Sequence, residues 1–87
     1  MNAVIIDVRE PIEYKMGHVK GAINIPPAKI VQGEPKELQG LPRDTKLIVY
    51  CLSGSRSRAS IPYLMQMGFT NIKNGINKDH VKRTYGL

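Results

Sequence analysis

The chain has 87 residues and a formal net charge of +6 at pH 7, and its hydrophobic fraction of 41% suits one small globular domain over residues 1–87. A single cysteine excludes an internal disulfide framework, and one cysteine with two histidines disfavours a zinc site. The scattered basic residues and only five aromatic residues favour attraction of small anions over binding to nucleic acid.

The N-terminal residues show no targeting signal. The first ten lack the basic start and the long apolar run of a signal peptide, although a leader that had been removed would leave no trace. No segment approaches the length that spans a bilayer. We therefore expect a cytoplasmic protein that does not act at a membrane.

Short apolar runs predict strands at four places, namely residues 4–7, 22–26, 46–51 and 69–73. The run 46–51 is apolar on both faces, which is typical of a central parallel strand. Helix-like segments lie between these runs, at residues 10–17, in one or two short pieces within 26–42, at 57–67 and at 77–85. This alternation predicts an α/β fold with a mainly parallel sheet.

Three residues bear on the expected helices at 57–67 and 77–85: two lie at helix ends, and one is a proline inside a helix. Gly68 is expected as the C-terminal cap of the first, and Asn77 as the N-cap of the second. Pro62 lies inside the first helix, where a proline removes one hydrogen bond, so we expect a kink or a distorted first turn.

The only cysteine follows the most apolar strand, in 47-LIVYCLSGSRSRAS-60. Ligands of parallel sheets bind beyond the carboxyl ends of strands, where Cys51 is expected to lie. A loop over 52–56 would lead to a helix starting near Ser57, whose N–H groups would lower the pKa of the thiol. Gly54 lets this loop curl into an anion-binding nest, and Arg56 offers a planar fork for an oxyanion. The combination favours a nucleophile over the inert core residue that a lone cysteine usually is.

The spacing between Cys51 and Arg56 helps to distinguish sulfur transfer from phosphoryl transfer. Cysteine phosphatases generally have five residues between these two positions, whereas four intervene here. The smaller loop suits a terminal sulfur atom better than a phosphoryl group, which leaves a cysteine phosphatase or arsenate reductase as a less favoured alternative.

Three segments resemble, in the same order, the motifs of single-domain rhodaneses, which belong to the rhodanese-like sulfurtransferase family. They are 6-IDVREPIEYKMGHVKGAINIP-26, 47-LIVYCLSGSRS-57 and 68-GFTNI-72, so the resemblance covers about residues 4–74. It implies a five-stranded, mainly parallel sheet with helices on both faces.

The resemblance also implies a reaction. The thiolate of Cys51 would take the outer sulfur of thiosulfate, or of a similar small anionic donor, as a persulfide. Cyanide, a thiol or a protein would then accept that sulfur, and no metal or organic cofactor is implied. A persulfide carrier, or a regulatory module that hardly turns over free substrate, is the alternative.

The resemblance assigns roles to residues near the thiol. Cys51 would be catalytic, and the following loop would bind the donor through Leu52, Ser53, Gly54, Ser55, Arg56 and Ser57. Asp7 and Arg9 would support this site: Asp7 is interpreted as structural, whereas Arg9 is either structural or attracts anions.

Other matched residues are interpreted as structural. His18 is expected to be a turn residue, and Glu10 and Glu13 to be charges at a helix N-terminus. The segment after Asn74 lacks the paired glycine and the tryptophan that are frequent in the family. The rim of the pocket near Gly75 and Ile76 is therefore expected to differ from the family pattern, and a shift caused by Pro62 in the preceding helix would weaken activity.

Overall fold

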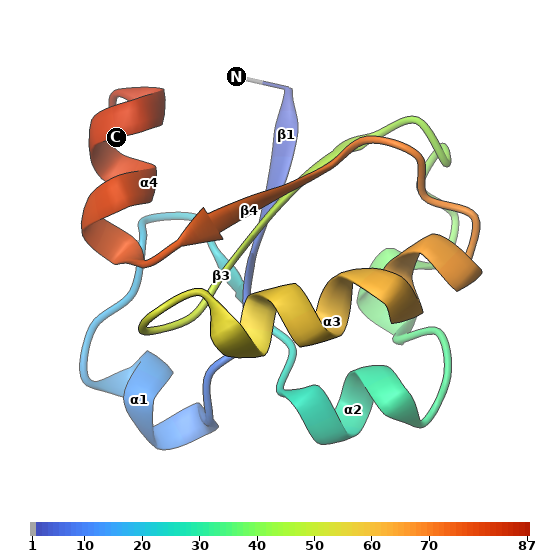
Figure 1. The fold of residues 1–87 in the computed structure, drawn as a ribbon, viewed down its shortest axis with the longest axis horizontal. Coiled ribbons are helices and arrows are strands. Elements are labelled where there is room, and N and C mark those ends of the chain that lie inside the picture. Colours follow the sequence, from blue (N-terminus) through green and yellow to red (C-terminus); the bar gives the residue numbers. More distant parts are fainter. Residues whose placement is uncertain (1) are drawn as a thin grey trace.

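The fold, seen in a computed structural model that describes residues 2–87, is a parallel sheet covered by helices on both faces (Figure 1). The strands are β1 (Ala3–Asp7), β2 (Ile23–Asn24), β3 (Lys46–Tyr50) and β4 (Ile72–Ile76), in the order β2-β1-β3-β4. The helices are α1 (Pro11–Lys15), α2 (Pro27–Val31), α3 (Ser55–Gln66) and α4 (Lys78–Tyr85), with a short 3-10 helix η1 (Lys36–Leu38). The predicted α/β class and parallel sheet are confirmed.

The five strands that the resemblance implied are wrong: residues 2–87 form four, the number of apolar runs read from the sequence. The segment expected as a strand over 22–26 is reduced to Ile23–Asn24. Pro26 and Pro27 follow it, and a proline has no N–H to continue a ladder of hydrogen bonds. The chain turns into α2 at this point instead, so β2 is a short edge strand.

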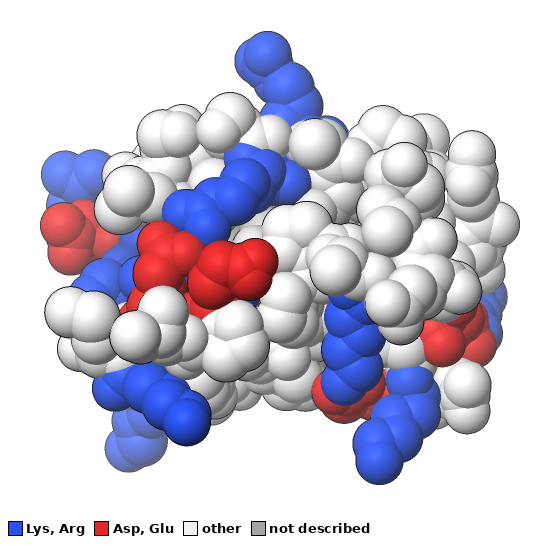
Figure 2. Space-filling model, turned by 90° about the horizontal axis from the view of Figure 1, so that it is seen from below, with Lys and Arg blue, Asp and Glu red and all other residues white. Residues whose placement is uncertain are grey.

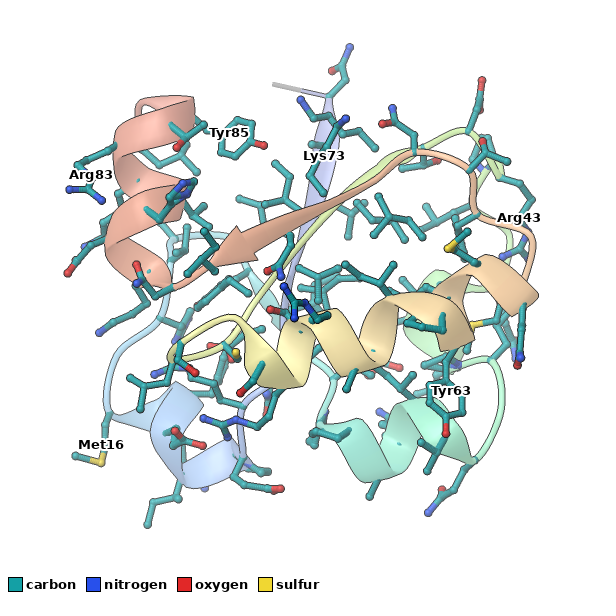
Figure 3. All side chains as sticks on the ribbon, viewed as in Figure 1. Met16, Arg43, Tyr63, Lys73, Arg83 and Tyr85 are labelled. Atoms are coloured by element: carbon teal, nitrogen blue, oxygen red, sulfur yellow. The ribbon has the colours of Figure 1, made fainter. Side chains whose placement is uncertain are left out.

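The central strand β3 buries both of its faces, as predicted from its continuous apolar run. Side chains fill the space between the sheet and the helices (Figure 3), and Leu47 and Val49 belong to a core that includes residues of α2 and α3. Ile48 and Tyr50 belong to a second core that includes Val81 of α4. Alternate side chains of a strand point to opposite faces, so a continuously apolar strand between two helical layers satisfies both.

Helix α3 begins two residues earlier than expected. Gly54, with a φ of 94°, takes the left-handed conformation at its N-cap, and the helix runs unbroken from Ser55 to Gln66. Pro62 lies seven residues after the helix begins, well away from the turn beside Cys51. Gly68 follows the helix with a φ of 101°. The predicted N-cap of α4 is confirmed, since the side chain of Asn77 accepts a hydrogen bond from the N–H of His80.

Strand β4 lies three residues later than expected and contains an irregularity. The register with β3 skips Gly75, so Val49 faces Asn74 and Tyr50 faces Ile76. A Cβ atom on Gly75 would lie 2.6 Å from Val81, so only glycine fits beneath α4. The end of β4 pairs with the end of β3 and α4 follows within two residues, so the start of α4 lies at the carboxyl end of β3.

Charged side chains of both signs lie next to one another on the face formed by α1, α2 and α3 (Figure 2). Three partly exposed ion pairs are formed among the described residues, namely Lys29–Glu37, Arg43–Glu34 and Arg56–Glu13. Within residues 2–87, none of the helices is long and apolar enough to cross a membrane.

Candidate active site

Cys51 directly follows β3, at the carboxyl end of the sheet. The N–H of Gly54 donates a hydrogen bond of 3.0 Å to its sulfur, and the hydroxyl of Ser57 lies 3.6 Å from it. The left-handed conformation of Gly54 turns the chain back over the thiol, and the first turn of α3 then places Ser57 on its other side. The predicted curled loop is therefore present, with its donors aimed at the sulfur.

The electrostatics of this loop favour the thiolate. Burial would by itself raise the pKa of Cys51, but the N–H groups of Ser57, Ser53 and Gly54 outweigh it, and the hydroxyl of Ser57 adds to them whenever its one proton points to the sulfur and not to Asn74. They lower the pKa of the thiol from 9.0 to about 7. The direction agrees with the prediction from sequence: the loop favours the thiolate over the neutral thiol.

Asn74, which the sequence did not single out, holds this arrangement together. Its Oδ1 accepts a hydrogen bond of 2.6 Å from Ser57, and its Nδ2 donates one of 3.2 Å to the carbonyl of Gly54. The N–H of Ile76 also donates to Oδ1. Asn74 thus ties the loop to β4; placing that strand at 69–73 hid this role, because it left Asn74 outside the sheet.

The thiol lies deeper than a freely accessible nucleophile would. Cys51 retains only 1% of its accessible surface and belongs to the core between the sheet and α3. It does, however, line a small hollow of about 150 Å³. The other residues that line this hollow are Arg9, Leu52, Asn77, Lys78 and Asp79. The residue therefore offers little surface to a reagent, and this hollow is where it borders open space.

Arg56 does not point its fork into that hollow. Both of its terminal nitrogens bind the carboxylate of Glu13, at 2.6 and 3.0 Å. Arg56 stands in the first turn of α3, and its guanidinium faces Glu13 of α1. The pair holds the pKa of Glu13 down to about 2, chiefly through the hydrogen bond from Arg56. A donor oxyanion would have to displace this carboxylate to bind Arg56. The sequence predicted that Arg56 binds the donor, but it did not reveal that Glu13 occupies the guanidinium.

Glu13 also acts at the N-terminus of α1, as predicted for it and for Glu10. The side chain of Glu13 accepts a hydrogen bond from the N–H of Glu10, and the two residues form a capping box. The nearby His18 contacts Tyr14, with its Nδ1 at 2.8 Å from the carbonyl and its ring stacked at 3.6 Å. These contacts agree with a structural turn residue.

Asp7 and Arg9 form a buried ion pair at the end of β1. Asp7 is completely buried, and its carboxylate accepts hydrogen bonds from Nε and Nη2 of Arg9 and from the hydroxyl of Tyr50. Arg9 also donates to the carbonyl of Gly17 at 2.6 Å. Asp7 has the structural surroundings that the sequence predicted, whereas Arg9 both braces the turn and lines the hollow at Cys51.

The remaining loop residues face solvent. Leu52 is 66% exposed at the edge of the hollow, and the hydroxyl groups of Ser53 and Ser55 lie 3.3 Å apart on the surface. Ser53 reaches the sulfur through its N–H and not through its side chain. The donor-binding roles predicted for these three residues stay predictions.

Three residues that line the hollow, Asn77, Lys78 and Asp79, belong to the segment after Asn74 that departs from the family pattern. Ile76 has a φ of 69°, which is unusual for a β-branched residue, and the N–H of Asn77 bonds to the carbonyl of Gly75 around it. The carbonyl of Ile76 accepts a hydrogen bond from the N–H of Cys51. Lys78 and Asp79 follow this tight turn directly and line the same hollow as Cys51. The turn comes after the irregularity in β4, which no sequence pattern predicted.

Metal chemistry has no evident site within residues 2–87, where no group of three or more histidine, cysteine, aspartate or glutamate side chains could hold an ion. The site thus consists of a small parallel sheet, a thiol at its carboxyl end and a loop that donates an N–H to the sulfur, and these features can be set beside known protein families. The model of the rhodanese-like domain matches residues 1–78. The chain belongs to the rhodanese-like domain family.

Relatives and solved structures agree with this membership. The rhodanese-like domain is 32% identical to a sulfurtransferase of Allochromatium vinosum, over 84% of this chain and 64% of the relative. It is 34% identical to a putative mitochondrial thiosulfate sulfurtransferase of Schizosaccharomyces pombe, covering 84% of this chain and 58% of the relative. The structure of a rhodanese with anions from E. coli superposes with a TM-score of 0.76 at 30% identity, over 90% of this chain and 89% of that one. The chain thus spans less than two thirds of the length of the two curated relatives.

The pH dependence of alkylation tests the loop of this rhodanese-like domain directly. We expect the rate with iodoacetamide to rise with a midpoint near pH 7, because the donors around Cys51 stabilise its thiolate. Replacing Ser57 by alanine removes the hydroxyl beside the sulfur and is expected to raise the midpoint by about half a unit to one unit.

Ser53→Ala is the matched control, since that residue offers the sulfur only its N–H. Its midpoint should equal that of the parent. If alkylation of the parent protein has its midpoint at or above about pH 8.5, the value of an unperturbed cysteine, the loop does not stabilise the thiolate.

Proposed function

We propose that this domain is a sulfurtransferase that carries a sulfane sulfur on Cys51. One observation carries the proposal: N–H donors of the loop converge on a thiol whose pKa is lowered to about 7. Such a loop stabilises negative charge on the thiolate and equally on the terminal sulfur of a persulfide. The names of two relatives, a sulfurtransferase and a putative thiosulfate sulfurtransferase, support the same chemistry.

The proposed reaction has two displacements. The Cys51 thiolate attacks the outer sulfur of thiosulfate, a new S–S bond forms, and the S–S bond of thiosulfate breaks with its electron pair leaving on sulfite. A nucleophilic acceptor, such as cyanide or a thiolate, then attacks the outer sulfur of the persulfide. The Cys51–sulfur bond breaks and its electrons return to the cysteine as thiolate. The donor we propose is thiosulfate or a similar small anion, and the acceptor is a thiol or a protein.

Restricted access to the thiol favours a second candidate, a persulfide carrier that hardly turns over free substrate. The residue is 1% exposed, and the hollow above it measures about 150 Å³. A carrier would receive and deliver its sulfur within a complex, where a partner places the reacting atom in the hollow. The two candidates share the persulfide and differ in the rate with small donors and acceptors.

Two measurements test these proposals together. Mass spectrometry after thiosulfate treatment should show one added sulfur atom, and that addition should disappear when Cys51 is alkylated first. Steady formation of thiocyanate from thiosulfate and cyanide supports the enzyme, whereas persulfide formation with negligible turnover supports the carrier. Absence of the added sulfur with every donor tried, including mercaptopyruvate, would refute both, and hydrolysis of an aryl phosphate would revive the phosphatase alternative.

A further inference from the structure

Lys78 lines the hollow at Cys51. It is the first residue of α4 and lines both the hollow at Cys51 and an adjoining one of about 300 Å³. Its side chain is half-buried and turns towards the end of α1, where Nζ lies 3.3 Å from the position that a Cβ on Gly17 would occupy. The ammonium group thus lies beside Gly17, and the lysine borders both the hollow at Cys51 and the adjoining one.

Lys78 forms no ion pair with another residue in the described part of the chain. Among residues 2–87, four basic side chains have a carboxylate within 4.0 Å, and Lys78 is not one of them. Two acidic residues share its hollows: Glu13, whose carboxylate is occupied by Arg56, and Asp79, whose side chain is on the exposed first turn of α4. Asp79 therefore opposes Lys78 more directly than Glu13 does.

Arg9 adds a second donor to the same place. It lines both hollows, and its Nε and Nη2 are used by Asp7 and Gly17. Its Nη1 has no hydrogen-bond partner among the residues that the structure describes. A guanidinium nitrogen with unused N–H groups beside a lysine ammonium is a favourable arrangement for an oxyanion.

We infer that Lys78, together with Nη1 of Arg9, forms a subsite for the charged end of a small anionic donor whose sulfur reaches Cys51. The inference deepens the proposed sulfur transfer and rests on it for the identity of the ligand. It moves recognition of the oxyanion from Arg56, which is engaged by Glu13, to a lysine in the segment that departs from the family pattern. The ligand class is a compact sulfur compound with a sulfonate-like or carboxylate group a few bonds from the reacting sulfur.

A pair of alkylating reagents tests the subsite without requiring sulfur transfer. Iodoacetate and iodoacetamide attack the same thiolate, but only iodoacetate carries a negative charge. The ratio of their rates cancels any change in the pKa of the thiol. We expect Lys78→Gln to lower the iodoacetate-to-iodoacetamide ratio about threefold to tenfold, through loss of the nearby positive charge. The parental ratio should fall towards that of the variant as salt is added.

Two further variants serve as controls. Lys82→Gln removes the same charge one turn further along α4 from an exposed position that lines neither hollow, and it should leave the ratio unchanged. Asp79→Asn should raise the ratio, because it removes the opposing carboxylate. For thiosulfate turnover, Lys78→Gln should raise KM by a similar factor while Lys82→Gln does not.

Each outcome decides between the subsite and the proposed function. Equal ratios in the parent and in Lys78→Gln would overturn the subsite, whatever the turnover. A lowered ratio in a domain that never forms a persulfide would retain the subsite and overturn the proposed function. A thiol that reacts with neither reagent would overturn both.

Discussion

Replacing Cys51 by serine is expected to reduce sulfur transfer by about 10³-fold or more, to the background rate. Serine keeps a small side chain beneath the loop, but its hydroxyl stays protonated at neutral pH and cannot form a persulfide. The chain has no second thiol that could substitute. Thiocyanate formation from thiosulfate and cyanide measures the loss, and mass spectrometry should find no added sulfur.

Cys51→Ala controls for the serine hydroxyl, which would be buried at a site where Ser57 is 3.6 Å from the sulfur. Both variants should keep a cooperative thermal unfolding transition close to that of the parent, since either change removes little volume. A serine variant that forms thiocyanate at the parental rate would end the assignment of the reaction to Cys51.

Replacing Asp7 by alanine is expected to lower the free energy of unfolding by about 3–5 kcal/mol, because it leaves the buried charge of Arg9 without its partner. Asp7 is completely buried and Arg9 is 6% exposed, so water cannot replace the carboxylate. Tyr50 would also lose an acceptor 2.8 Å away. For a domain of this size, the corresponding fall in Tm is roughly 15–30 °C. Urea unfolding followed by circular dichroism measures the change.

Glu34→Ala is the matched control, because it breaks a carboxylate–arginine pair whose side chains are 28% and 39% exposed. It should cost less than about 1 kcal/mol. In the double variant Asp7→Ala with Arg9→Met, part of the stability should return, since no unpaired charge remains. A cost for Asp7→Ala similar to that of Glu34→Ala would show that the buried pair contributes little.

The order of elements could be predicted from the sequence because it depends on local patterns. The apolar run that became β3 is buried on both faces, and Asn77 caps α4 as its type and position indicated. Family membership was equally readable, since it rests on motifs in sequence order. Boundaries were less accurate: α3 starts early because Gly54 adopts a left-handed conformation, and β4 lies late because its bulge accommodates Gly75 beneath Val81.

The chemistry of the site could be predicted only in part. The N–H donors around Cys51 follow from a strand, a glycine-containing loop and a helix that are contiguous in sequence. Their anchor, Asn74, belongs to another strand and joins the loop only through tertiary contacts. The depth of the thiol has the same origin, because the residues that cover it come from three separate segments.

The sequence by itself determined which atom can act as a nucleophile and which backbone groups surround it, because both lie within seven consecutive residues. Only the tertiary structure decided which cations remain for a ligand. Arg56 stands near Cys51 in sequence, yet Glu13 of a distant helix occupies its guanidinium. Lys78 is remote in sequence, yet it lines the hollow. Charges interact through space, so their partners depend on how the elements pack and not on the order of residues along the chain.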